Sequence, residues 1–236
     1  MRNVFVGISS LAVAVSALAL GGCGSDGGDG TLEPAAPEDF EPAGQIANPE
    51  IVYAPAPYGV SKGSIIANFQ FVGFPNAMED NGGFRLIQLA DFYNPTGNEV
   101  FPEGSLYGAG TAKPKALLID VASVWCGPCN DEADYVLPGK YLQYKPQGGE
   151  FLLMLADGKD PGEPATGESL RKWTTKYEVD FPAAFDPSYK LGNLFVADVF
   201  PQNMIINTRT MEIVEVIGGA PDGEFWKTYQ DVLDEP

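Results

Sequence analysis

The chain of 236 residues contains no histidine, only three cysteines, and 14 basic residues against 32 acidic ones. Without histidine, a zinc site would need four other ligands, and three cysteines, one of them far from the other two, do not supply them. The formal net charge of −18 argues against direct binding to nucleic acid or to an anionic membrane surface. An acidic surface that aids solubility is the simplest account of this charge.

The chain also lacks an apolar run that is long enough for a membrane span. The stretch 4–20 is short and rich in Ala and Ser, and it follows Arg2 as in a secretory signal peptide. It ends in Leu-Gly-Gly-Cys23, which resembles the bacterial lipobox, in which the cysteine is lipidated and becomes the new N-terminus. The alternative is an ordinary signal peptide with an incidental cysteine. Lipidation would leave an even pair of cysteines for redox chemistry.

Composition divides the chain into a lipoprotein-type signal peptide (1–22), an acidic tether (23–50) and a folded domain (51–236). The tether is rich in Gly, Pro, Asp and Glu and contains no Lys or Arg, which predicts a disordered, self-repelling segment. The folded domain comprises an N-terminal extension (51–110) and a core (111–236). The residue after Cys23 is glycine rather than an acid, which by resemblance to enterobacterial sorting indicates the outer membrane.

Two of the cysteines form the motif Cys126-Gly-Pro-Cys129. An apolar run (115–122) precedes the motif and predicts a buried strand, and helix-compatible residues (130–137) follow it. The free N–H groups at the start of a helix would stabilise a thiolate on Cys126, and Cys129 lies one helical turn further on. A two-residue loop removes little chain entropy, so a purely structural disulfide would stabilise poorly. The spacing therefore favours redox chemistry over a structural disulfide or half of a zinc site.

The segment Trp125-Cys-Gly127-Pro128-Cys resembles the active site of the thioredoxin family, and the resemblance extends over residues 115–236. It implies an α/β thioredoxin-like fold, in which helices flank a mixed central sheet. Asp120, six residues before the first cysteine, matches the buried acid of that family. Two segments of the extension, 64–71 and 84–93, resemble the N-terminal hairpin of the redoxin and TlpA/ResA-like branch. Glu132 matches an acid common in TlpA-like proteins, and its charge would oppose a nearby thiolate.

A second segment of the resemblance is Val199-Phe200-Pro201-Gln202, which leads into an apolar strand. In thioredoxin-fold proteins a cis-proline begins this strand and faces the cysteine pair, and Pro201 holds that position. The residue after it is often Thr but is Gln202 here, which alters the groove. The resemblance implies a substrate groove that the following residues form: Trp125, Gly127, Pro128, Phe200 and Pro201. The backbone of Phe200 would pair with an extended substrate segment.

The remaining patterns predict the elements that complete such a domain. A helix break is expected at Leu137-Pro138-Gly139, and a solvated acidic loop at 157–167. Further strands are expected at 150–156, 181–186 and 211–217, and further helices at 169–177, 189–195 and 222–233.

Asp120 lies within a run that is apolar enough for a strand buried on both faces. Desolvation should raise the pKa of such a carboxyl group. Because the chain has no histidine, this carboxylate is the candidate base that takes the proton from Cys129. The alternative is an acid held at a strand end by backbone N–H groups.

These observations predict a membrane-tethered, extracytoplasmic thiol–disulfide oxidoreductase of the bacterial cell envelope, which reduces protein disulfides. Cys126, exposed at the helix start, would attack the substrate disulfide, and Cys129, shielded behind it, would resolve the mixed disulfide. No cofactor beyond the redox-active disulfide and no metal is expected. The expected partners are protein disulfides or dithiols and a membrane electron donor, and the domain is expected to be monomeric.

Two alternatives stay open at this point. A peroxide reductase with an antioxidant role would use Ser123 in place of the peroxiredoxin threonine, although Ile119 stands where a proline is expected. A lipoprotein with a disulfide could also bind a partner without catalysis.

Overall fold

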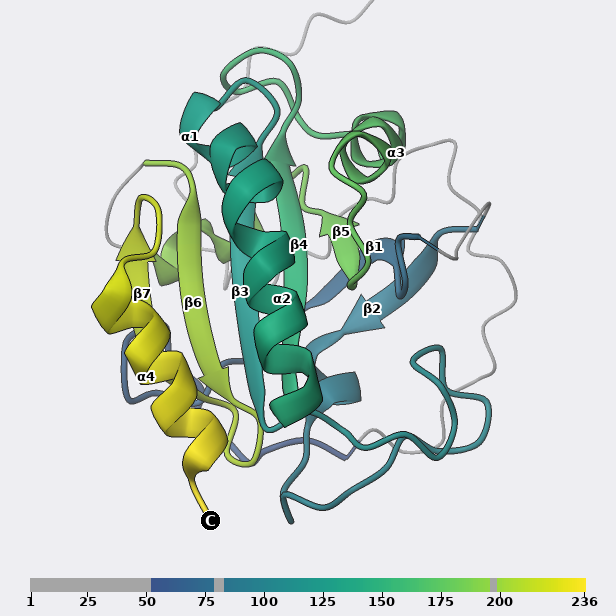
Figure 1. Cartoon of the computed structure of the whole chain (residues 1–236), viewed down its shortest axis with the longest axis vertical. Coiled ribbons are helices and arrows are strands. Elements are labelled where there is room, and N and C mark those ends of the chain that lie inside the picture. Colours follow the sequence, from purple (N-terminus) through teal and green to yellow (C-terminus); the bar gives the residue numbers. More distant parts are fainter. Residues whose placement is uncertain (1–51, 79–82, 196–198) are drawn as a thin grey trace, which may run out of the picture. The chain divides into compact units, whose positions relative to one another are not determined.

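The computed structural model describes residues 52–78, 83–195 and 199–236. The predicted signal peptide (1–22), the lipidated Cys23 and the tether (23–50) lie outside these residues. The described chain forms a seven-stranded mixed sheet in the order β2-β1-β5-β4-β3-β6-β7 (Figure 1). The strands are β1 Gln70–Phe74, β2 Arg85–Gln88, β3 Ala116–Ser123, β4 Gly149–Asp157, β5 Ala183–Phe185, β6 Gln202–Asn207 and β7 Glu212–Gly218.

The centre of the sheet is formed by β3 and β4, which pair in parallel, while β6 runs antiparallel to β3 on its other side. Every residue of β3 and all but the last residue of β4 are buried. Continuous apolar runs of this kind suit strands that are covered on both faces. The predicted mixed sheet of a thioredoxin-like fold is therefore confirmed.

The two faces of the sheet are covered by different structures. The α-helices of the described chain pack into one core layer; they are α1 Gly127–Asp131, α2 Leu137–Tyr144, α3 Gly167–Lys176 and α4 Gly223–Asp234. Figure 1 shows α2 and α4 lying across this face, and both contact the central strands. The N-terminal extension, which includes the 3₁₀ helix η1 (Leu89–Phe92), covers the opposite face together with the 3₁₀ helix η4 (Lys190–Leu194).

Side-chain caps fix where α3 and α4 begin. The Thr166 hydroxyl accepts the Ser169 N–H at 3.1 Å, and the Ser169 hydroxyl accepts the Thr166 N–H at 2.7 Å. The Asp222 carboxylate accepts the Phe225 N–H at 3.0 Å at the start of α4. Such caps satisfy backbone donors that have no partner within the helix.

The predicted helix break at 137–139 is wrong. A π-helical turn, η2 (Glu132–Val136), joins α1 to α2, and the N–H of Leu137 bonds to the carbonyl of Glu132. This wider turn places Pro138 in the first turn of α2. Because N–H groups in a first turn have no acceptor within the helix, the missing N–H of proline costs no helical hydrogen bond there. The helical layer therefore continues without a break from the cysteine pair to Tyr144.

The strand predicted at 64–71 is displaced. The first strand of the sheet begins only at Gln70 and forms the predicted hairpin with β2, Phe71 lying opposite Ile87. Residues 63–66 instead run along the outer edge of β7. The Gly63 N–H donates to the Ile213 carbonyl at 2.8 Å, and the Ile213 N–H donates to the Ser64 carbonyl at 2.8 Å.

Candidate active site

The Cys-Gly-Pro-Cys segment directly follows the loop at the carboxyl end of β3. Cys126 is the N-cap residue of α1 and Pro128 lies in its first turn. Cys126 and Cys129 form a disulfide with a Cα–Cα distance of 5.3 Å. The backbone N–H of Cys129 donates to the Sγ atom of Cys126 at 3.1 Å. An N–H aimed at this sulfur favours a thiolate there once the disulfide is reduced.

The expectation that Cys126 is exposed is wrong for this state of the protein. Cys126 is 3% exposed and Cys129 is 1% exposed. Both sulfurs are bonded to each other and belong to the core layer that also contains Ala122 and Ala133. Gly127 and Pro128, between them, are exposed and mark where a partner could approach.

Pro201 lies beside the cysteine loop because Gln202, the next residue, pairs with Val121 of β3. The Phe200–Pro201 peptide bond is cis, as predicted. The Pro201 carbonyl accepts the Gly219 N–H at 2.7 Å. Within the described chain, the backbone N–H and carbonyl of Phe200 have no hydrogen-bond partner, so they are available to an extended ligand.

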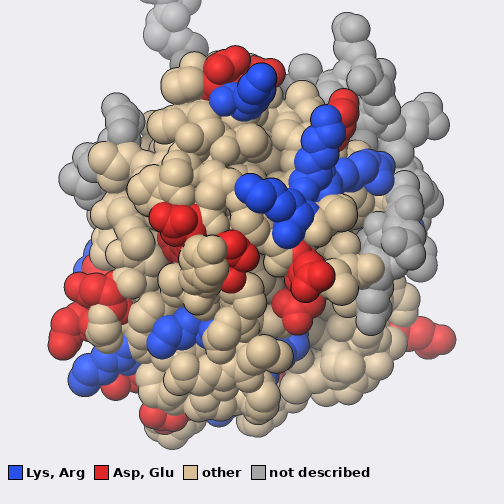
Figure 2. All heavy atoms as spheres, turned by 45° about the horizontal axis from the view of Figure 1, so that its top comes forward, with Lys and Arg blue, Asp and Glu red and all other residues tan. Residues whose placement is uncertain are grey.

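Aromatic side chains form the surface next to the disulfide. Trp125 is 40% exposed, and its ring meets that of Phe200 edge to face with 5.8 Å between centroids. Phe200 in turn contacts Tyr189 at 5.7 Å, and the Tyr189 hydroxyl donates to the Gln202 side chain. Figure 2 shows that the end of the molecule that carries α1 is mostly uncharged, with separate groups of acidic and basic side chains.

The loop after β4 holds Trp125 in place, a role that sequence reasoning missed. The Trp125 indole N–H donates to Asp157 Oδ2 at 2.9 Å, and the same oxygen accepts the Gly162 N–H at 3.0 Å. The only available signal was that Asp157 ends the strand parallel to β3, so both loops emerge at one edge of the sheet. The loop that was expected to be merely solvated therefore positions a side chain of the site.

Two buried carboxyl groups lie in the helical layer with the disulfide. Asp120 is 3% exposed and Glu132 is 2% exposed. Burial raises the pKa of Asp120 to about 7. A rise of this pKa was predicted from the sequence. Burial, aided by the charge of Asp120, raises the pKa of Glu132 to about 9. Glu132 is therefore protonated at neutral pH, and the expectation that its charge opposes a thiolate is wrong.

Neutral polar side chains accompany these acids. Asn203 lies opposite Asp120 in the pairing of β6 with β3. It lowers the pKa of Glu132 somewhat without completing a well-formed hydrogen bond to it. The buried atoms without a partner in the described chain include Asp120 Oδ1, both Glu132 carboxyl oxygens, both Asn203 amide atoms and the Ser123 hydroxyl. Unsatisfied buried polar atoms are uncommon in folded proteins, and acids with perturbed pKa values are found most often at functional sites.

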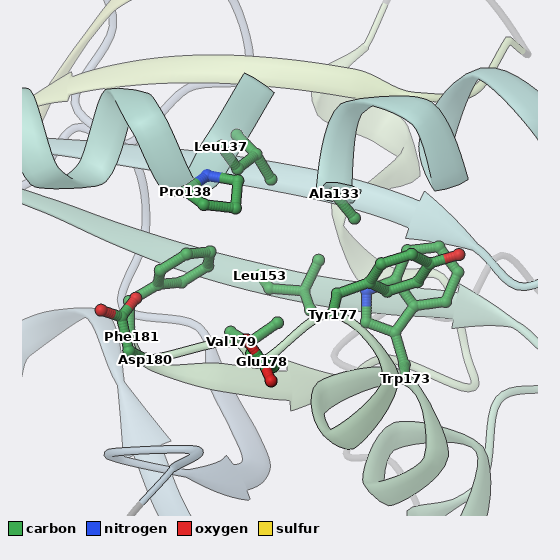
Figure 3. Close-up of a pocket in the computed structure, with 10 residues that line it drawn as sticks. All are labelled: Ala133, Leu137, Pro138, Leu153, Trp173, Tyr177, Glu178, Val179, Asp180 and Phe181. Atoms are coloured by element: carbon green, nitrogen blue, oxygen red, sulfur yellow. The ribbon is translucent and has the colours of Figure 1, made fainter. Parts of the chain in front are cut away.

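A small cavity lies away from the disulfide, between the helix that follows the cysteines and the segment after α3 (Figure 3). Its volume of about 10 Å³ has room for about one water molecule and is far below the range of ~300–1,000 Å³ that is usual for ligand sites. Ala133, Leu137, Trp173, Tyr177 and Phe181 contribute to its mostly apolar lining. It is therefore a packing defect rather than a substrate site.

Within the described residues, no cluster of three or more Cys, Asp or Glu side chains is arranged to hold a metal ion. None of the helices in the same part of the chain is long and apolar enough to cross a membrane.

The strand order and the paired cysteines at the start of α1 define a thioredoxin-like fold. No family model matches the chain. The chain is similar to the thiol-disulfide oxidoreductase ResA of Bacillus cereus strain ZK / E33L, with 24% identity over 116 residues, which is 49% of this chain and 62% of the relative. The ResA of Bacillus anthracis matches with the same identity and coverage. The match thus spans less than two thirds of the length of these relatives.

Solved structures give the same picture of the fold. A putative thiol:disulfide interchange protein DsbE from Chlorobium tepidum superimposes with a TM-score of 0.52 and 18% identity, covering 74% of this chain and 99% of that protein. A putative protein disulfide isomerase from Bacteroides thetaiotaomicron gives a TM-score of 0.51 and 17% identity, covering 74% of this chain and 89% of that one. At these identities, the likeness establishes a shared fold.

Proposed function

We propose that this protein is an extracytoplasmic thiol–disulfide oxidoreductase that reduces protein disulfides through Cys126 and Cys129. The observation that carries the proposal is the disulfide at the start of α1, with the Cys129 N–H aimed at Cys126 Sγ and the unpaired Phe200 backbone beside it. A protein substrate would lie across Trp125 and Phe200 and pair with that backbone. The sequence likeness to the ResA proteins supports the same class of reaction.

The reaction begins with the reduced pair. The Cys126 thiolate attacks one sulfur of the substrate disulfide, which forms a mixed disulfide and releases the first substrate sulfur as a thiolate. Asp120 then takes the proton from Cys129, whose thiolate attacks Cys126 Sγ and releases the second substrate sulfur. Two electrons pass to the substrate, the Cys126–Cys129 bond forms, and the proton on Asp120 is available to a departing sulfur. A thiol donor at the membrane restores the dithiol.

The peroxide-reductase alternative gains no support from the geometry. Ser123, on which it depends, is fully buried in β3 and its hydroxyl does not face the surface.

Single cysteine variants test the proposed roles. Cys129→Ser should accumulate mixed disulfides with a protein substrate such as insulin, because the attacking thiol remains and the resolving thiol is gone. Cys126→Ser should accumulate none. The parent chain should reduce insulin when dithiothreitol is supplied and should not accelerate peroxide consumption. Trapping by Cys126→Ser instead would reverse the roles, and a parent chain inert in both assays would leave only partner binding.

We further propose that the domain is monomeric and is held at the membrane by a lipid on Cys23. The motif at Cys23 and the acidic segment after it support this placement. Cys23→Ser should move the protein to the soluble fraction and remove the acyl mass from the N-terminal peptide. An unchanged membrane fraction without acyl mass in the parent would refute it.

A further inference from the structure

The side chain of Asn130 ties the active-site loop to the start of α1. Asn130 directly follows Cys129 and is half-buried. Its Nδ2 group donates to the Val124 carbonyl at 3.2 Å and to the Cys126 carbonyl at 2.6 Å. The Cys126 carbonyl also accepts the backbone N–H of Asn130 at 3.1 Å. The peptide group that follows Cys126 is thus held from two directions.

The other end of the Asn130 amide is held by two residues that close α3. Asn130 Oδ1 accepts the hydroxyl of Tyr177 and the ammonium of Lys176, the latter at 3.2 Å. The Lys176 ammonium also donates to the Tyr177 oxygen. All four hydrogen-bonding positions of the Asn130 amide are therefore used, and its orientation is fixed by its partners. A chain of donors runs from Lys176 through Tyr177 and Asn130 to the Cys126 carbonyl, and such chains strengthen each bond.

Packing keeps Tyr177 in position for this contact. Its ring meets the Trp173 ring edge to face at 4.7 Å, and the Lys176 ammonium lies 4.5 Å from the Tyr177 ring centroid. Figure 3 shows Tyr177 and Trp173 side by side, facing Ala133 of η2, the turn that follows the cysteines. The contact joins elements that are 47 residues apart in the sequence.

We propose that Asn130, held by Tyr177 and Lys176, is a positioning residue that sets the redox equilibrium of the cysteine pair. That equilibrium is the reduction of the Cys126–Cys129 disulfide. Reduction takes up two electrons and one proton and yields a thiolate on Cys126 and a thiol on Cys129. By fixing the peptide after Cys126, Asn130 keeps the Cys129 N–H directed at Cys126 Sγ, at 3.1 Å. That N–H stabilises a charged sulfur more than a disulfide sulfur, so the network favours the reduced form.

This inference rests on the proposed function, and glutathione supplies the reductant for its test. The parent chain, Asn130→Ala and Tyr177→Phe are equilibrated with glutathione redox buffers, and the thiolate of the reduced proteins is titrated by its ultraviolet absorbance. Asn130→Ala should shift the equilibrium about tenfold toward the disulfide, which is ~30 mV. It should also raise the pKa of the Cys126 thiol. Tyr177→Phe should shift both quantities in the same direction by less, because the Lys176 contact to Asn130 remains.

Tyr141→Phe is the matched control. It also removes a buried tyrosine hydroxyl, one that donates to Glu150 at 3.1 Å, away from the cysteine loop. This variant should lower the melting temperature and leave the redox equilibrium and the thiol pKa unchanged. If Asn130→Ala fails to fold, Tyr177→Phe decides the question.

The outcomes separate the two proposals. A parent chain without a reversible disulfide overturns both. A parent with a normal redox equilibrium, together with variants that lose stability but keep that equilibrium and thiol pKa, overturns only the positioning role.

Discussion

Glu150 and Glu132 are both almost completely buried glutamates, 3% and 2% exposed, yet their surroundings are opposite. Glu150 receives the Tyr141 hydroxyl and the Phe151 N–H, each at 3.1 Å, and the Lys145 ammonium. Neither carboxyl oxygen of Glu132 has a partner in the described chain, and its near neighbour Asp120 also leaves one oxygen unpaired.

The difference separates a carboxylate that is satisfied by donors from a pair of acids that lacks them. A buried carboxylate that receives several donors is satisfied and joins helix to sheet. A buried acid without such donors holds its proton to a higher pH than usual, and it can release and regain that proton when a neighbouring sulfur changes state. We therefore expect Glu150 to govern stability alone, and the Asp120 and Glu132 pair to govern both stability and redox chemistry.

The largest expected effect is on the pH dependence of stability. Because folding raises the pKa of Asp120 and Glu132, their contribution to stability is complete below the unfolded pKa values, near pH 4. It is lost as pH rises through about 7 for Asp120 and about 9 for Glu132. The unfolding free energy of the oxidised parent should fall by on the order of 6 kcal/mol between pH 5 and pH 8. Asp120→Asn combined with Glu132→Gln should flatten this slope in urea titrations.

Burial also raises the pKa of Asp91 and Asp186, so a residual slope is expected in both proteins. Equal slopes in the parent and the double variant would show that folding does not raise the pKa values of Asp120 and Glu132.

The next effect is on turnover. Asp120→Asn keeps the shape of the side chain and removes the base that we propose for Cys129. Insulin reduction near pH 7 should slow about tenfold, or ~1.4 kcal/mol in the barrier, while stability should not fall. Rates equal to those of the parent from pH 6 to pH 9 would leave Asp120 as part of the scaffold.

The smallest effect is expected at the paired glutamate. Glu150→Gln keeps an acceptor for Tyr141 and weakens the contact with Lys145, whose side chain is half exposed and can turn to water. The unfolding free energy should fall by about 1 kcal/mol, with no change in turnover or in the redox equilibrium. A shift in that equilibrium would mean that the two carboxylate sites are coupled, and the distinction between them would fail.

Much of this fold could be predicted because its central strands are apolar on both faces and its motif is local in sequence. The strand before Cys126, the cis peptide bond at Pro201 and the buried Asp120 all follow from short segments. The burial of Glu132 did not follow, since Asp131 and Asp134 beside it favour only the first turn of a helix. Which helix face Glu132 occupies depends on the π-helical turn, which changes the rotation of the side chains.

Contacts between distant segments could not be predicted from the sequence either. The hydrogen bond of Trp125 to Asp157 and that of Tyr177 to Asn130 depend on how loops and helices pack over the sheet. None of these residues belongs to a spacing pattern that indicates its partner. Polar side chains with long-range partners leave no periodic signal of the kind that identifies strands and helices.

The segment 63–66 along the outer edge of β7 has a consequence for behaviour at high concentration. An open edge strand offers unpaired N–H and carbonyl groups to any other strand and can seed aggregation. Here Gly63 and Ser64 occupy backbone groups of Ile213, and Lys62 places an ammonium 2.6 Å from the Glu215 carboxylate further along the same strand. The N-terminal extension thereby protects this sheet edge and disfavours edge-to-edge association between copies of the protein at high concentration.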